Sequence, residues 1–374
     1  MNDKETEEMK TALPGTEAEA EAEAREEKAN GASYPDLLTV SPSPHLRNSD
    51  STRTVMTEVI IALIPALVWG IITFGLRALT VTIISVVACV GFEALAQLAL
   101  RRPITVSDMS AALTGLFIAL NMPVSAPLWI PVVASFFAVV VVKQVFGGIG
   151  KNIVNPAMAA RVFVMLSWAG QMTKFTAAGA RYPFFGDVAG GYDAVATATP
   201  LAALKSGNVP EASLFDMFTG KIGGCIGEVS TLLLLLGGIY LLVRRIISWH
   251  IPVAYLGTVA VLTYAFPKTG DAVSFMLYEL MAGGLVLGAF FMATDYTTSP
   301  ISPVGRIVYG IGCGALTVLI RYFGGYPEGT SFAILIMNLL VWYLDSAFKP
   351  RWFGASTLKK REREKKKAEK AEKA

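Results

Sequence analysis

The chain has 374 residues, of which 53% are hydrophobic and only 16% are charged. Because soluble domains carry about 25% charged residues, this composition excludes an ordinary soluble globular protein and indicates a chain that crosses a membrane several times. The formal net charge of +3 says little about partners, since it averages one acidic end and one basic end.

The two ends of the chain differ in composition from everything between them. The acidic, alanine-rich run "TEAEAEAEAREEKANG" falls near the start, and the chain closes on "LKKREREKKKAEKAEKA". Such segments bury too little apolar surface to fold alone. We therefore expect a disordered acidic cytoplasmic tail over 1–36 and a basic cytoplasmic tail over 351–374. No basic stretch precedes an apolar run near Met1, so we expect no cleaved signal peptide.

Between the tails lie ten apolar segments that approach the length of about 20 residues needed to span a bilayer. The third, fifth and seventh are short, which predicts broken or tilted helices whose irregular backbone lines a buried site. The segments cover approximately 55–75, 79–99, 109–122, 127–146, 156–170, 229–247, 251–267, 276–293, 304–323 and 330–347.

The first five segments resemble the last five at a nearly constant offset. Runs that begin at Val55 and Val229 are 174 positions apart, and "GGIGKNIVNPAMAARVF" precedes "GGYPEGTSFAILIMNLL" by 177 positions. An odd number of spans per half turns the second half upside down. We therefore predict an all-α polytopic membrane protein with about ten transmembrane helices in two inverted five-helix repeats, 37–170 and 229–350, joined by an extracytoplasmic loop over 171–228.

Lysine and arginine in the short loops set the orientation. With the N-terminus inside, the inner segments hold most of these residues and the short outer loops hold only three, Arg77, Lys268 and Arg321. Because positive charge favours the cytoplasmic side, both termini should be cytoplasmic. The loop over 171–228 then faces outward, and we expect a multi-pass protein of the cytoplasmic (inner) membrane of a prokaryote.

Polar residues inside or at the ends of apolar segments are candidates for a buried pathway, because charge at the bilayer centre is costly. The alternative for each is a place at the membrane interface. Asn152, Asn155 and Arg161 flank a glycine-rich turn followed by Pro156, where free N–H groups could bind an anion or the polar edge of a flavin. Further polar residues of this kind are Glu58, Glu93, Asp108, Asn121, Lys143, Asp295, Thr297 and Asn338.

The stretch "FMATDYTTSPISPVGR" in the second half is rich in oxygen ligands. Its Asp295 and Thr297 lie in a polar break at the end of a span. The functional interpretation is the lining of a cation or cofactor site, and the alternative is a cytoplasmic turn. Three cysteines and two histidines are scattered without metal-ligand spacing, so we expect no metal site and no catalytic side chain of this type.

Four motifs in order resemble the RnfD branch of the NqrB/RnfD family. These are "SPSPHLRNSDSTRTVMTEV" before the first span, "GGIGKNIVNPAMAARVF", "DAVATATPL" and "DYTTSPISPVGRIVYG". The resemblance runs from about residue 37 to 350. It implies a subunit of the Rnf complex, which couples electron transfer between ferredoxin and NAD to Na⁺ or H⁺ translocation. Such a subunit is not expected to be active alone. Its protein partners would be the other membrane and peripheral redox subunits. We expect it to contact the lipid bilayer and to bind no nucleic acid.

The resemblance also implies a covalent cofactor. In this family a flavin transferase, acting outside the cytoplasmic membrane, joins FMN through its phosphate to a threonine of a Ser/Thr-Gly-Ala-Thr motif. The modified position falls on Thr199, with Thr197 as the alternative because Ala196 and Thr197 depart from the motif. Asp193 keeps the preceding acid, and Pro200 and Leu201 would support the loop. A second flavin, riboflavin or FMN, is implied as a non-covalent ligand near Asn155 to Arg161.

Two other functions fit the sequence without these motifs. Inverted repeats and intramembrane polar residues also suit a transporter or channel for a small polar solute. A structural scaffold whose basic tail docks a cytoplasmic subunit or anionic lipid is a further alternative.

Overall fold

The computed structural model describes residues 51–179, 199–228 and 230–349, all within one compact unit, Ser51–Ala374. The regular elements in these ranges are helices, and one isolated β-bridge pairs Pro123 with Cys225. The tails and the predicted site residues Asp193 and Thr197 lie outside the described residues.

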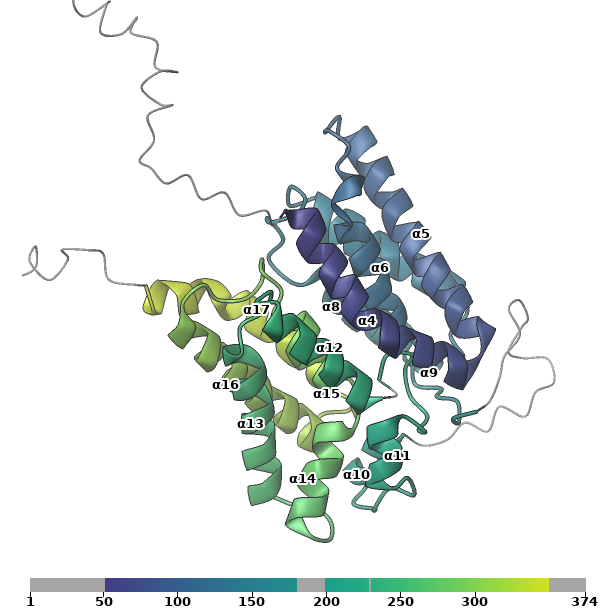
Figure 1. The fold of residues 1–374 in the computed structure, drawn as a ribbon, viewed down its shortest axis with the longest axis vertical. Helices are drawn as coiled ribbons and strands as arrows, with labels where there is room; N and C mark the ends of the chain where they lie inside the picture. Colours follow the sequence, from purple (N-terminus) through teal and green to yellow (C-terminus); the bar gives the residue numbers. More distant parts are fainter. Residues whose placement is uncertain (1–50, 180–198, 229, 350–374) are drawn as a thin grey trace, which may run out of the picture. The chain divides into compact units, whose positions relative to one another are not determined.

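The first half of the chain forms the helices drawn in purple and blue in Figure 1. They are α4 (Thr52–Phe74), α5 (Leu76–Ala99), α6 (Ser110–Leu120), α7 (Trp129–Phe136) with its π-helical continuation (Phe137–Gln144), and α8 (Pro156–Ser167). Three short helices follow: α9 (Ala169–Met172), α10 (Pro200–Lys205) and α11 (Leu214–Thr219).

The second half forms the helices drawn in green and yellow. They are α12 (Thr231–Val243), α13 (His250–Ala265), α14 (Ala272–Met281), α15 (Leu285–Leu287) with a π-helical continuation (Gly288–Met292), α16 (Pro303–Phe323) and α17 (Thr330–Ala347). Among the described residues, four helices, α4, α5, α16 and α17, are long and apolar enough to cross a membrane, and the bent pair α14–α15 makes a fifth candidate. The chain is therefore a helical membrane protein.

Local sequence explains where several helices begin. A polar residue followed by proline starts α8, α10 and α16: Asn155, Thr199 and Ser302 each place a side-chain oxygen on a backbone N–H of the first turn. Proline suits the first helical position because its missing N–H would have no partner there.

The eighth predicted span differs from the expectation. The sequence predicted a continuous helix over 276–293, whereas α14 and the α15 segment meet at a bend of 63°. Gly283 in the gap has φ 68°, a left-handed conformation that glycine adopts without strain. Conversely, the seventh segment, predicted to be broken or tilted, is the unbroken helix α13. Two adjacent glycines, rather than a short apolar run, mark the break.

The two halves pack through α4 against α12 and α8 against α17. At the first contact, a side chain at Gly237 of α12 would collide with the carbonyl oxygen of Ala62 on α4. Because helices in membranes associate through close backbone approach at small residues, Gly237 explains why these helices can lie this near.

Candidate functional site

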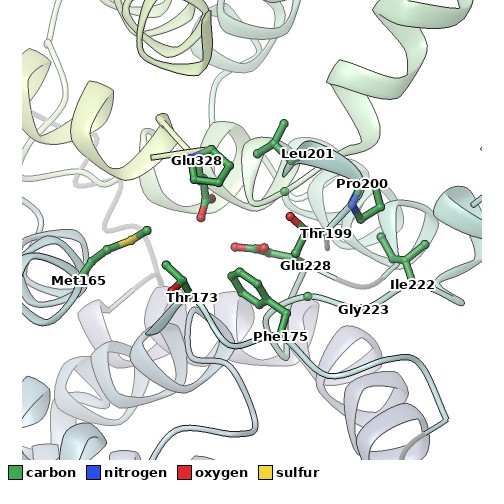
Figure 2. A pocket seen from close by; sticks show the side chains of 13 residues that line it. Met165, Thr173, Phe175, Thr199, Pro200, Leu201, Ile222, Gly223, Glu228 and Glu328 are labelled. Carbon is green, nitrogen blue, oxygen red and sulfur yellow. The ribbon is translucent and has the colours of Figure 1, made fainter. Parts of the chain in front are cut away.

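The pocket most relevant to function encloses about 520 Å³, part of it open to solvent. This is the size range of small-molecule sites. Figure 2 shows side chains from both halves of the chain and from the connecting segment converging on it. It is lined by Met165, Thr173, Phe175, Thr199, Pro200, Leu201, Ile222, Gly223, Gly224, Glu228, Gly283, Pro327 and Glu328.

Thr199 lies in the wall of this pocket and directly precedes α10. Its backbone is extended, with φ −64° and ψ 151°, and its hydroxyl accepts a hydrogen bond of 3.3 Å from the N–H of Ala202. At the other end of α10, the ammonium of Lys205 donates to the carbonyls of Gly324 and Tyr326 at 2.5 and 3.0 Å. The segment that carries Thr199 is therefore fastened to the loop between α16 and α17.

Behind the pocket, Arg161 on α8 binds two carboxylates with one nitrogen. Its Nη2 donates to Glu228 Oε1 at 2.9 Å and to Glu328 Oε2, while Nη1 donates to Asn121. The Arg161 side chain is 3% exposed, and those of Glu228 and Glu328 are 8% and 12% exposed. One cation thus faces two carboxyl groups in a buried place beside Thr199.

The break between α14 and α15 closes the pocket from the second half. The N–H of Gly284 donates to Glu328 Oε1 at 3.1 Å. A Cβ at Gly284 would lie 2.6 Å from Glu328 Oε1 and 3.0 Å from Glu228 Oε1. Any larger residue here would force the Glu328 carboxylate to shift, so glycine suits the close approach of this backbone to both carboxylates.

The remaining predicted site residues gather at the opposite end of α8. Asn152 donates to Thr297 Oγ1 at 3.0 Å, and Asn155 donates to the Met292 carbonyl at 3.3 Å. Asp295 Oδ2 accepts from Thr297 at 3.0 Å. A second pocket of about 480 Å³ is lined by these four predicted residues together with Ser110 and Lys143. The structure thus brings four predicted residues together in one polar cluster and places Arg161 in a separate group with Glu228 and Glu328.

Sequence reasoning missed Glu228 and Glu328. Neither follows a recognisable motif, and they lie 67 and 167 positions after their common partner Arg161. The internal repeat held a signal for Glu328: it is 177 positions after Lys151, the residue that precedes the predicted Asn152. For Glu228 the sequence held no comparable signal. Within the part of the chain that the structure describes, no cluster of ligating side chains could hold a metal ion.

The model of the NQR2, RnfD, RnfE family matches residues 39–354. The chain belongs to this family.

Curated relatives share nearly their whole length with the chain. It is 48% identical over 326 residues to the D subunit of the Na⁺-translocating ferredoxin:NAD⁺ oxidoreductase complex of Acetobacterium woodii, covering 86% of this chain and 97% of that protein. It is 42% identical over 329 residues to the D subunit of the proton-translocating ferredoxin:NAD⁺ oxidoreductase complex of Clostridium ljungdahlii, covering 85% and 97%. It is 39% identical over 329 residues to the D subunit of the ion-translocating oxidoreductase complex of Stutzerimonas stutzeri, covering 81% and 92%.

Proposed function

We propose that this chain is the D subunit of an ion-translocating ferredoxin:NAD⁺ oxidoreductase of the Rnf type, and that it carries FMN on Thr199. Family membership and the near full-length similarity to D subunits support the first part and favour it over the transporter and scaffold alternatives. The observation that carries the second part is the position of Thr199 in the wall of a pocket of ligand size. The other Rnf subunits and a flavin transferase are then its partners.

The residues around Thr199 fit a tethered flavin. Met165, Phe175 and Ile222 supply apolar walls for a flat ring system, and Thr173 and Glu228 supply polar groups. A phosphoester on the Thr199 hydroxyl would hold the ring at a high effective concentration beside these groups. When bound, the flavin supplies the electron carrier, while the protein supplies position and electrostatics.

We further propose ten membrane segments in two inverted halves. Met109 and Gly283 are 174 positions apart, have φ 64° and 68°, and each closely precedes a half-helix, α6 and α15. The packing of α4 on α12 and of α8 on α17 joins helices that occupy the same place in each half, as a two-fold axis would require. The non-covalent flavin or ion pathway would lie in the cluster of Asn152, Asn155 and Asp295.

Fluorescence of the denatured protein tests the covalent flavin. The full chain, expressed with a flavin transferase, should give a fluorescent band after denaturing electrophoresis. Thr199→Val should remove the fluorescence because no hydroxyl remains, and Thr199→Ser should restore part of it. A dark wild-type band made with an active transferase would overturn the tether.

Two control variants define which threonine carries the flavin. Thr173→Val removes another hydroxyl from the same pocket and should leave the band fluorescent. Thr197→Val should also leave it fluorescent. Loss of fluorescence in Thr197→Val together with its retention in Thr199→Val would move the attachment to Thr197.

A further inference from the structure

The unusual feature of the Thr199 pocket is its charge balance. Glu228 and Glu328 both accept hydrogen bonds from Nη2 of Arg161, so the two carboxyl groups lie against each other. Like charges held this close in a buried site disfavour joint ionisation, so one carboxyl of the pair gains affinity for a proton. Behind the break between α14 and α15, Glu279 and Arg321 form an ion pair of 2.7 Å and neutralise each other. Arg321 therefore does not offset the charge of Glu228 and Glu328.

The hydrogen bonds indicate which carboxyl holds the proton. Glu328 accepts through both oxygens, one from Arg161 and one from the N–H of Gly284, whereas Glu228 accepts from Arg161 through Oε1. Glu228 lies in the segment between α11 and α12, outside the candidate spans, and lines the pocket. Burial, and next the charge of Glu328, raises the pKa of Glu228 to about 7.

The groups that face Glu228 come from four elements. Arg161 reaches it from α8, Glu328 from the α16–α17 loop, and Cys225 from its own segment. Gly284 at the start of α15 lies within contact distance. The carboxylates of Glu228 and Glu328 and the Thr199 hydroxyl converge on the same space (Figure 2). A charge introduced on Thr199 therefore acts on Glu228 at short range and in a place that water screens poorly.

We propose that Glu228, held against Glu328 by Arg161, binds a proton whose uptake is coupled to the charge of the redox group held at Thr199. The inference rests on the proposed function. Each electron that a one-electron donor in a partner subunit delivers to the pocket adds a negative charge. One proton then enters from the aqueous phase and converts a Glu228 carboxylate into a carboxylic acid. When the electron leaves, the O–H bond breaks and the proton returns to water, so charge balances at both stages.

The experiment is a redox titration of the flavin in the purified, flavinylated full chain at pH about 6 to 8, the window around the pKa of Glu228. One proton per electron corresponds to ~59 mV per pH unit. The flavin's own protonation contributes to the slope in every variant, so the comparison is between variants. Glu228→Gln should flatten the dependence of the midpoint potential on pH, and Glu328→Gln should flatten it too. Glu211→Gln changes an exposed carboxyl outside the lining of this pocket and should retain the wild-type slope.

The outcomes separate this inference from the proposed function. A dark denatured band overturns the flavin tether itself. A fluorescent band with equal slopes in wild type, Glu228→Gln and Glu328→Gln overturns the proton coupling and leaves the tether intact. Each titration is repeated with Na⁺ replaced by choline. A midpoint potential that responds to Na⁺ and not to pH, and loses that response in Glu228→Gln, overturns the proton in favour of Na⁺.

Discussion

Lys143 of the π-helix after α7 and Glu93 of α5 form a buried ion pair with an N–O distance of 2.7 Å. The ammonium also donates to Ser110 Oγ at 2.7 Å, and Gln144 donates to Glu93 at 2.9 Å. Both charged side chains are at most 4% exposed. The charge of Lys143 is therefore neutralised inside the protein.

Breaking this pair should destabilise the protein strongly. Lys143→Met leaves Glu93 buried without its counter-ion, which typically costs about 3–5 kcal/mol. The thermal unfolding temperature in detergent should fall clearly. The double variant Lys143→Met/Glu93→Met should recover much of the loss because neither charge remains. Lys151→Met, at an exposed lysine, serves as the control and should change little. Equal stability of Lys143→Met and wild type would contradict the assignment.

The contact between α4 and α12 predicts opposite changes in stability for two glycine-to-alanine variants. Gly237→Ala forces a methyl group against the Ala62 carbonyl oxygen and should destabilise by about 1–3 kcal/mol. Gly257 in α13 has no atom within 4 Å of an added Cβ. Gly257→Ala should therefore be neutral or stabilising by up to about 1 kcal/mol, because alanine is the better helix former. Unfolding temperatures that shift in the same direction would contradict this packing.

Much of the helical layout could be predicted from sequence because it depends on local composition. Apolar runs of sufficient length predicted the long helices α4, α5, α16 and α17, and polar residues before proline marked helix starts such as that of α8. The break at Gly283 was missed because the apolar run continues on both sides of it. Hydropathy reports burial in lipid and is insensitive to a backbone turn within the run.

The site was only partly predictable for a different reason. Thr199 belongs to a local motif, and Asn152 and Thr297 belong to local polar turns. The cluster of Arg161, Glu228 and Glu328 exists only after three distant segments meet. Its members share no spacing, so a single sequence contains no local pattern that links them.

Chemical labelling tests the orientation. Asn208 and Lys151 are exposed and belong to opposite ends of the molecule in the proposed topology. With the native cysteines buried, single replacements report position cleanly. A membrane-impermeant maleimide should label Asn208→Cys in intact cells and Lys151→Cys only after permeabilisation. The reverse pattern would invert the proposed topology.

Stability should depend on pH through Glu228. Its pKa is raised from 4.5 to about 7, chiefly by burial, so between these values the folded state binds more protons than the unfolded state. The contribution of Glu228 to the free energy of unfolding is therefore greatest at low pH and falls as the pH rises through about 7. Glu228→Gln should flatten this part of the profile of unfolding temperature between pH about 5 and 8. Equal changes in unfolding temperature between pH about 5 and 8 in the wild type and in Glu228→Gln would refute the raised pKa of Glu228.

Gly284 tests how tightly the break in the second half holds the carboxylates. Gly284→Ala places a methyl group 2.6 Å from Glu328 Oε1, so the carboxylate must move and its bond to the Gly284 N–H must weaken. We expect a loss of stability of about 1–3 kcal/mol and a changed flavin midpoint potential, because the charge nearest the pocket shifts. Gly325 has no atom within 4 Å of an added Cβ, so Gly325→Ala is the matched control. If the two variants unfold at the same temperature and share one midpoint potential, Gly284 does not position Glu328.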